Sequence, residues 1–418
     1  MIGTLSQVPV RLDDPPVVDT RTAHTGPDRR AAIEVDQGGL EQVSNPDRVA
    51  SLTGARAVAA LLVVGTHAAY GTGALSHGYL GLIFARLEIG VPIFFVLSGF
   101  LLFSPWVGAA AAGGRPPRVR RYAWNRIRRI MPAYIITVIG VYIVYEFRVI
   151  EPNPGHTWMG LLRNLTLTQV YSPGYVLTYL HQGLTQMWSL AVEVAFYVAL
   201  PFLAYLLLAV LCGRTWRPAR LLIGLAALAA VSPLWLVVLH TTDWLPAGAG
   251  LWLPHYLVWF VGGMVLAVLR VMNARCFGFL ALPLAAVSYL IVSTPIAGRV
   301  SEASLGLSED VAKTMFYAVI ATLVVAPLAL GDRGRYSQLM SSRPMVWLGE
   351  ISYEIFLLHV VVIEVAMVSV LGWPIYTGSV TGLFLLTVAL TVPLAWALHR
   401  LTRPRRGCDP ARGLPQRA

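Results

Sequence analysis

Long apolar segments separated by polar ones dominate the chain from residue 51 to residue 401. A bilayer core of about 30 Å requires about 20 apolar residues per helix. Runs of this kind predict spans over residues 55–71, 89–111, 132–150, 187–212, 219–240, 252–270, 276–295, 314–331, 348–371 and 377–399. The pattern therefore predicts an all-α polytopic membrane protein of about ten transmembrane helices.

Polar stretches flank and interrupt this pattern. Residues 1–50 contain no apolar run that could serve as a signal peptide, so we expect a disordered cytoplasmic tail there. The membrane domain would cover residues 51–401, and residues 402–418 would form a second, basic cytoplasmic tail. Residues 151–186 have Pro and Gly near both ends, which favours a long outer loop with a short helix over a further span.

Composition indicates the same class of protein. Hydrophobic residues make up 56% of the 418 residues and charged residues only 13%, whereas a soluble protein carries about 25% charged residues. These values exclude a soluble globular protein, and the chain is too apolar to be disordered. Its three cysteines have no metal-type spacing, so neither a zinc site nor any other metal is expected.

The net charge of +11 follows the topology rather than a nucleic-acid interface. With ten spans, 27 of the 32 basic residues lie on the side that holds both termini and 5 on the other. Cytoplasmic loops are enriched in Arg and Lys, which predicts that both termini are cytoplasmic. We therefore expect a multi-pass protein of the inner (cell) membrane with no nucleic-acid partner.

Ionisable side chains inside predicted spans are candidates for function because lipid makes them costly. Arg56 and His67 lie eleven residues apart on the first span, on one face and about 16 Å apart along the axis. His67 suits proton transfer near neutral pH, although helix packing and snorkelling are the alternative explanations for the two residues. Glu193 lies in the fourth span, where it must be paired or protonated.

Further polar groups lie near the ends of other spans. Ser98 and Gly99 are small enough to let a helix or a ligand approach the backbone. Arg126 and Arg129 precede the third span, where they could bind phosphates or simply reflect topology. Ser352 and His359 share a face of the ninth span. Three histidines in or beside outer loops could contact an acceptor or be ordinary surface residues: His156, His181 and His255.

Five motifs occur in this order along the chain: Arg56-x10-His67, Phe94-Phe-Val-Leu-Ser-Gly-Phe100, Arg126-x2-Arg129-Ile-x-Pro132-x-Tyr134, Trp188-Ser-Leu-x-x-Glu193-x-x-Phe-Tyr197 and Gly349-x-Ile-Ser-Tyr-x-Ile-x-Leu-Leu-His359. Taken together, they resemble those of the membrane-bound acyltransferase family 3. The resemblance covers about Leu52 to His399. Thr53 departs from it, because family members usually have an acidic residue there. The tail after Leu401 is too short and too basic to be the hydrolase-like domain of some members.

The resemblance implies a ten-helix enzyme that O-acylates sugars, glycolipids, polysaccharides or antibiotics. Its co-substrate would be a cytoplasmic acyl-CoA, most often acetyl-CoA, with no permanently bound cofactor. His67 would act as general base or carry the acyl group as an acyl-histidine, and Glu193 would orient His67 or the acceptor. The residues expected to bind CoA are Arg56, Arg126, Arg129, Ser98 and Tyr134, and those expected to support them are Trp188, Ser189, Ser352, Tyr353 and His359.

Two alternatives stay open at the level of sequence. A proton-coupled transporter or flippase of a lipid or glycan would also use intramembrane His, Glu and Arg residues, but only an enzyme would consume acyl-CoA and release free thiol. The preferred acceptor is a hydroxyl of a cell-envelope sugar or glycolipid, within a lipid environment. The Arg-rich and Lys-poor composition suits a GC-rich bacterial genome, which leaves a macrolide-type metabolite as the alternative acceptor.

Overall fold

A computed structural model describes residues 46–147, 153–172, 180–299, 305–374 and 376–403. Within these residues the chain forms helices and no strand. The predicted N-terminal tail lies almost entirely outside the described residues, and the first helix within the described residues begins at Pro46 rather than after residue 50. The predicted C-terminal tail is described only as far as residue 403.

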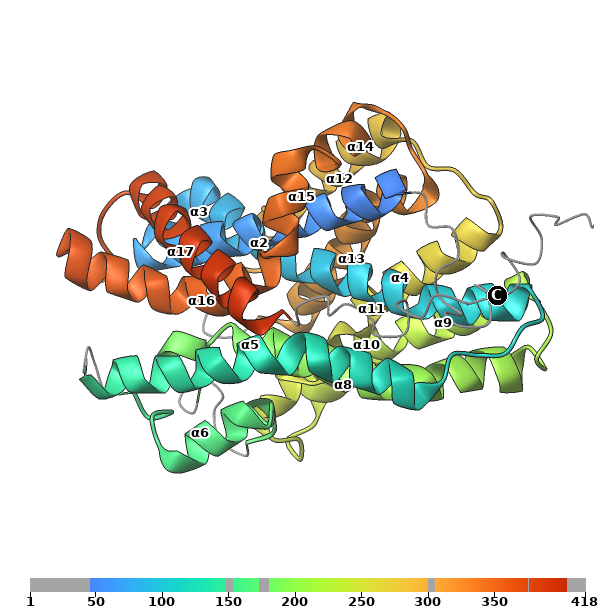
Figure 1. Cartoon of the computed structure of the whole chain (residues 1–418), viewed down its shortest axis with the longest axis horizontal. Helices are drawn as coiled ribbons and strands as arrows, with labels where there is room; N and C mark the ends of the chain where they lie inside the picture. The colour runs from blue at the N-terminus through green and yellow to red at the C-terminus, as the bar shows by residue number, and fades with distance from the viewer. Residues whose placement is uncertain (1–45, 148–152, 173–179, 300–304, 375, 404–418) are drawn as a thin grey trace, which may run out of the picture. The chain divides into compact units, whose positions relative to one another are not determined.

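The long helices follow the predicted spans (Figure 1). They are α2 (Pro46–Gly71), α4 (Gly90–Ala111), α5 (Val119–Phe147), α8 (Met187–Ala204), α9 (Pro218–Ala229), α10 (Val231–Thr241), α11 (Leu253–Val271), α12 (Gly278–Val292), α13 (Leu307–Leu330), α16 (Ser352–Val365) and α17 (Val380–Thr402). Shorter helices are α3 (Gly78–Ala85), α6 (Trp158–Leu165), α14 (Arg335–Met340) and α15 (Arg343–Glu350). Two π-helical turns, η5 (Tyr205–Leu211) and η8 (Ala366–Leu371), extend α8 and α16.

Nine helical segments of the described chain are long and apolar enough to cross a membrane, which confirms a polytopic all-α protein. The seventh predicted span corresponds to α12, a shorter apolar helix of 15 residues. The fifth span is α9 and α10 in direct succession. The loop predicted over 151–186 contains α6, as expected, together with the single turns η3 (Gln169–Tyr171) and η4 (Gln182–Leu184).

One boundary differs from the prediction in a way that affects the site. The Arg-rich segment before the third span is helical, because α5 begins at Val119 and continues through Pro132. Arginine is a good helix former, and the helix breakers Gly113, Gly114, Pro116 and Pro117 all precede this segment. Arg126 and Arg129 are therefore held on a rigid helix rather than on a loop.

Helices α4 and α11 form the most buried pair. About two-thirds of each span is buried inside the protein, against 22% for the spans of α8 and α17. Glycines allow this close approach: a Cβ atom on Gly99 would lie 2.1 Å from the Phe260 carbonyl oxygen, and one on Gly263 would lie 1.9 Å from that of Val96. Small residues allow membrane helices to pack closely in this way, as predicted for Gly99.

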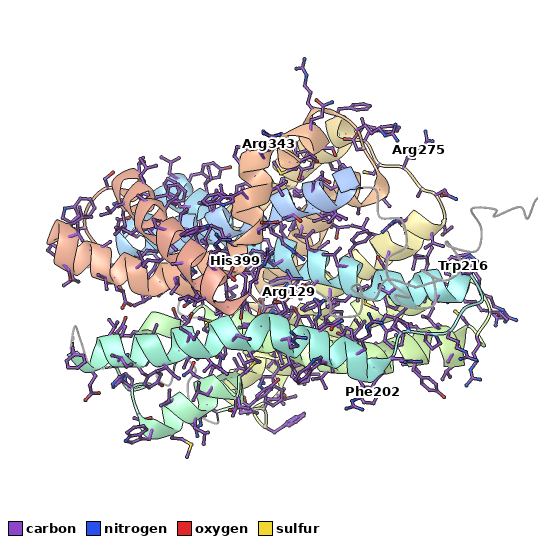
Figure 2. The ribbon with its side chains drawn as sticks, viewed as in Figure 1. Arg129, Phe202, Trp216, Arg275, Arg343 and His399 are labelled. Carbon is purple, nitrogen blue, oxygen red and sulfur yellow. The ribbon has the colours of Figure 1, made fainter. Side chains whose placement is uncertain are left out.

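Helix α2 joins this pair to the C-terminal helices. It contacts α4 on one side and α15, α16 and α17 on the other (Figure 1). The peripheral helices carry large exposed apolar side chains; Phe202 of α8, for example, is 73% exposed and lies at the edge of the protein in Figure 2. Such exposure is expected of a surface that faces lipid. A buried site can therefore be enclosed by the helices that contact α2 and α4, and not by the peripheral surfaces.

Candidate active site

A cavity of about 360 Å³ lies among α2, α4, α5, α8 and α16. It collects polar residues from motifs that are far apart in the sequence. Eight of the twelve predicted site residues line it: Arg56, Ser98, Arg126, Arg129, Ser189, Glu193, Ser352 and Tyr353. The other four, His67, Tyr134, Trp188 and His359, lie outside its lining.

Three arginines without carboxylate partners define the charge of this cavity. Among the described residues, Arg56, Arg126 and Arg129 form no ion pair. The Nε atom of Arg126 is buried and has no hydrogen-bond partner. Against these three positive side chains, the lining of the cavity holds one carboxylate, Glu193. Because guanidinium groups bind phosphates and carboxylates in a bidentate manner, this surplus of donors and charge suits an anionic ligand.

Glu193 is the carboxylate in the cavity wall, and two hydroxyl groups hold it. Ser98 donates a short hydrogen bond to its Oε1 atom, and the Tyr197 hydroxyl donates another to the same oxygen at 2.7 Å. Sequence reasoning did not assign Tyr197 to the site, although its position four residues after Glu193 places it on the same helix face. The hydrogen bonds of Glu193 therefore run to α4 and within α8, and not to His67 as one predicted alternative required.

The neighbour of His67 is instead His359. Their ring centroids lie 4.9 Å apart, and His359 Nε2 is 3.4 Å from His67 Nδ1. Each Nδ1 also lies 2.8 Å from a backbone carbonyl oxygen, that of Val63 for His67 and that of Phe356 for His359. A carbonyl oxygen can only accept, so each ring, in its neutral form, carries its proton on Nδ1. This arrangement leaves a lone pair on His67 Nε2, which is what a general base requires.

The remaining predicted residues have structural contacts. Tyr134 is fully buried and donates a hydrogen bond to the Asn164 carbonyl at 2.6 Å, which ties α6 to α5 rather than lining the cavity. Trp188 packs on Tyr256 of α11, with centroids 5.0 Å apart. Ser189, Ser352 and Tyr353 line the cavity and donate to backbone carbonyls, those of Gln186, Gly349 and Ile130, respectively.

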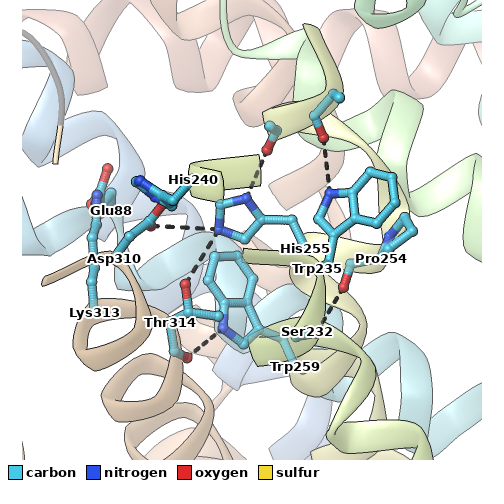
Figure 3. Close-up of polar contacts among 12 residues, drawn as sticks. Glu88, Ser232, Trp235, His240, Pro254, His255, Trp259, Asp310, Lys313 and Thr314 are labelled. Carbon is cyan, nitrogen blue, oxygen red and sulfur yellow. Dashed lines mark hydrogen bonds and ion pairs between the residues drawn. The ribbon is translucent and has the colours of Figure 1, made fainter. Parts of the chain in front are cut away.

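A second polar cluster lies around the start of α13 (Figure 3). The Lys313 ammonium is 2.6 Å from a Glu88 carboxylate oxygen, and the Asp310 carboxylate lies 3.3 Å from His240 and 3.7 Å from His255. The Nδ1 atom of His255 is 2.8 Å from the Gly250 carbonyl oxygen. His255, which the sequence suggested as a possible acceptor contact, thus belongs to a network that satisfies its own charges.

The other two loop histidines contact each other. His156 Nδ1 lies 3.1 Å from His181 Nε2, and His156 Nε2 lies 3.1 Å from Glu146. Burial, together with the neighbouring His156, lowers the pKa of His181 to about 3. His181 is therefore neutral near pH 7, and the pair holds the segment after α5 against that helix.

Comparison with known proteins adds independent information. A family model described as an acyltransferase domain matches residues 49–400. Acyltransferase MdmB of Streptomyces mycarofaciens is 29% identical over 387 residues, which cover 84% of this chain and 90% of that protein. Peptidoglycan O-acetyltransferase OatA of Listeria monocytogenes is 24% identical over 350 residues, which cover 74% of this chain but only 49% of that protein. No solved structure matches the chain.

Proposed function

The chain belongs to the acyltransferase family whose model spans residues 49–400 and is an integral membrane O-acyltransferase, and on this premise we propose that its donor is an acyl-CoA bound in the arginine-lined cavity. The observation that carries the proposal is the convergence of Arg56, Arg126 and Arg129 without carboxylate partners. CoA is a polyanion whose phosphates would supply the missing negative charge. The positive-inside pattern of the sequence supports entry from the cytoplasm.

In this proposal the donor extends along α2. Arg56 and His67 are eleven residues apart on one continuous helix, which separates them by about 16 Å along its axis. The long pantetheine arm of CoA separates its phosphates from its thioester, so the arginines would hold the phosphates while the thioester lies near His67. Glu193, fixed by Ser98 and Tyr197, lies at the wall between α4 and α8 and would accept an N–H group of the arm.

The chemical step follows from the tautomer of His67. Its Nε2 lone pair takes the proton of an acceptor hydroxyl, and the hydroxyl oxygen attacks the thioester carbonyl carbon. The new C–O bond forms, the C–S bond breaks, and the proton on His67 then returns to the departing thiolate to give free CoA. His359, which faces His67, fixes the ring orientation. The acyl-histidine route would use the same nitrogen as nucleophile.

The proposed acceptor is a hydroxyl of a cell-envelope sugar or glycolipid, and the proposed acyl group is acetyl. The support is the similarity to a protein named as a peptidoglycan O-acetyltransferase. The enzyme would act in the inner membrane, with both termini in the cytoplasm.

The test uses membranes that contain the full chain and acetyl-labelled acetyl-CoA. We expect labelled product and released thiol with the wild type, and loss of both by at least about 100-fold for His67→Ala. His77→Ala is the matched control, because His77 is exposed and lies outside the cavity. Extraction and mass analysis of the labelled product identify the acceptor. Absence of label and of thiol release with wild type would refute acetyl-CoA as the donor, and equal activity of the two variants would remove His67 from the reaction.

A further inference from the structure

Helix α5 carries arginines on two opposite faces. Arg126 and Arg129 line the cavity. Arg120 and Arg128 are exposed and do not line it. On a helix with 3.6 residues per turn, the midpoint of the second pair lies about 170° around the axis from the midpoint of the first pair. The second pair therefore points away from the cavity.

Exposed apolar side chains share the face of Arg120 and Arg128. Trp124 and Ile127, which lie between these arginines in the sequence, are 57% and 50% exposed. Ile135 and Ile139, farther along the helix, are 37% and 43% exposed. All four lie within about 60° of the midpoint of the arginine pair. Only 39% of this span is buried inside the protein, so the stripe is a lipid-facing surface that continues into the arginine-bearing turns.

The length of α5 places these turns at the level of the lipid headgroups. The helix has 29 residues and is about 44 Å long. This length matches a bilayer with its headgroup layers, about 40–45 Å, rather than the hydrocarbon core of about 30 Å. The apolar part after Pro132 fills the core, so the turns that carry Arg120 and Arg128 lie beyond it. Trp124 is typical of this level, because tryptophan is enriched at membrane–water interfaces.

The charge of this face is uncompensated by neighbouring acidic residues. Residues 89–145 contain no Asp or Glu. Within the part of the chain that the structure describes, neither Arg120 nor Arg128 forms an ion pair. A guanidinium group binds a phosphate in a bidentate manner, and phosphates of the surrounding lipid lie at the same depth as these side chains.

We propose that Arg120, Trp124, Ile127 and Arg128 of α5 form a binding surface for anionic phospholipids. The two guanidinium groups bind the headgroup phosphate, and the acyl chains lie along the exposed isoleucines of the same face. A headgroup with net negative charge, such as phosphatidylglycerol, is favoured over phosphatidylcholine, because the choline cation cancels the phosphate charge. This binding is independent of the proposed acyl transfer, since the face points away from the cavity.

The experiment titrates phosphatidylglycerol or phosphatidylcholine into the full chain in a neutral detergent and counts bound lipid by native mass spectrometry. One arginine near an anionic membrane surface contributes about fivefold in affinity. The double variant Arg120→Gln/Arg128→Gln should therefore raise the Kd for phosphatidylglycerol about 25-fold at low salt. Replacement of both residues by Lys keeps the charge and should give a Kd between those of the wild type and the Gln variant.

The matched control is Arg333→Gln/Arg335→Gln. It removes the same charge from two exposed positions next to Asp332. Its Kd for phosphatidylglycerol should stay within about twofold of the wild-type value, because solvent and salt screen these charges. If the Gln double variant at Arg120 and Arg128 does not elute as a folded protein, the two single variants take its place, and each should raise the Kd about fivefold.

Three results would overturn the lipid surface. They are equal affinity of the wild type for the two lipids, equal Kd values for the Gln double variant and its control, and displacement of phosphatidylglycerol by inorganic phosphate beyond that caused by chloride at equal ionic strength. The last result would indicate a soluble phosphate as the ligand. None of these measurements involves acetyl-CoA, so failure of the lipid surface and failure of the proposed function are distinguishable.

Discussion

Replacement of Arg126 by alanine should weaken donor binding without weakening the fold. In the described part of the chain this side chain forms no ion pair, and its buried Nε atom has no partner. A residue placed for stability would be expected to have such partners, because an unsatisfied buried donor costs about 1–3 kcal/mol. Arg126→Ala removes that cost and also removes one of the positive charges that act on Arg56.

The loss on the binding side is larger. A hydrogen bond to a charged group contributes about 1.5–3 kcal/mol, and about 1.4 kcal/mol corresponds to a tenfold change in an equilibrium constant. Loss of one guanidinium–phosphate contact should therefore raise the Kd for CoA about 10- to 150-fold. Arg126→Lys keeps the charge but not the planar fork of donors, so its Kd should lie between those of the wild type and Arg126→Ala.

The assay pairs calorimetric titration of CoA with thermal unfolding, both on the purified protein in detergent at low and high salt. Arg128→Ala is the control, because Arg128 lies on the same turn of α5, is exposed and does not line the cavity. We expect the Tm of Arg126→Ala to equal or exceed that of the wild type. The Kd of Arg128→Ala for CoA should stay within about threefold of the wild-type value, because solvent and salt screen an exposed charge. A lowered Tm with an unchanged Kd would show that Arg126 stabilises the fold, and equal Kd effects at Arg126 and Arg128 would show that position in the cavity is irrelevant.

Three further predictions test the packing, the loop and the cavity wall. Gly263→Ala should force α11 away from α4 and lower the Tm by several degrees, because its Cβ would lie 1.9 Å from a backbone oxygen. Gly140→Ala, whose Cβ would have no atom within 4 Å, should leave the Tm unchanged or higher. A similar drop in Tm for both variants would refute the packing argument. His181 has a pKa of about 3 in the folded protein against about 6.5 when unfolded, so its contribution to stability is complete above pH 6.5 and declines as the pH falls towards 3, by up to about 1.4 kcal/mol per pH unit. Melting curves between pH 7.5 and 4.5 should therefore be flatter for His181→Gln than for wild type, and parallel curves would count against this origin. Tyr197→Phe deletes the 2.7 Å hydrogen bond to Glu193 and should raise the KM for acyl-CoA about 2- to 12-fold. Tyr205→Phe is the control and should leave the KM unchanged, because Tyr205 is 60% exposed. Equal KM values for the two variants would remove Tyr197 from the site.

The apolar pattern predicts the helices well because each span must satisfy its own backbone hydrogen bonds in lipid. Every predicted span has a helical counterpart among the described residues, although α12 is shorter than predicted. The pattern fails at the start of α5, where charged residues continue a helix that hydropathy alone would begin at Pro132. Helix propensity and the position of Gly and Pro residues, rather than apolarity, determine such a boundary.

The composition of the site could be predicted, but its pairings could not. Spacing within one helix is local, so the shared face of Glu193 and Tyr197 could be read from the sequence. Which helices face each other depends on long-range packing, and the sequence alone did not favour His359 over Glu193 as the neighbour of His67. The close approach of α2 and α16 decides this pairing, and no single motif contains both helices.

Partners distinguish charges that bind a ligand from charges that hold the fold. An intramembrane charge is a functional candidate by default. Arg86, however, is buried and donates hydrogen bonds of 2.6 to 3.0 Å to the backbone carbonyls of Val292, Ala297 and Gly298. Glu88 is likewise satisfied by Lys313 and Tyr317. Helix packing alone accounts for both residues. Among the described residues, Arg56, Arg126 and Arg129 have no ion pair of this kind, and the buried Nε atom of Arg126 has no hydrogen-bond partner, which makes them the stronger candidates for binding an anionic ligand.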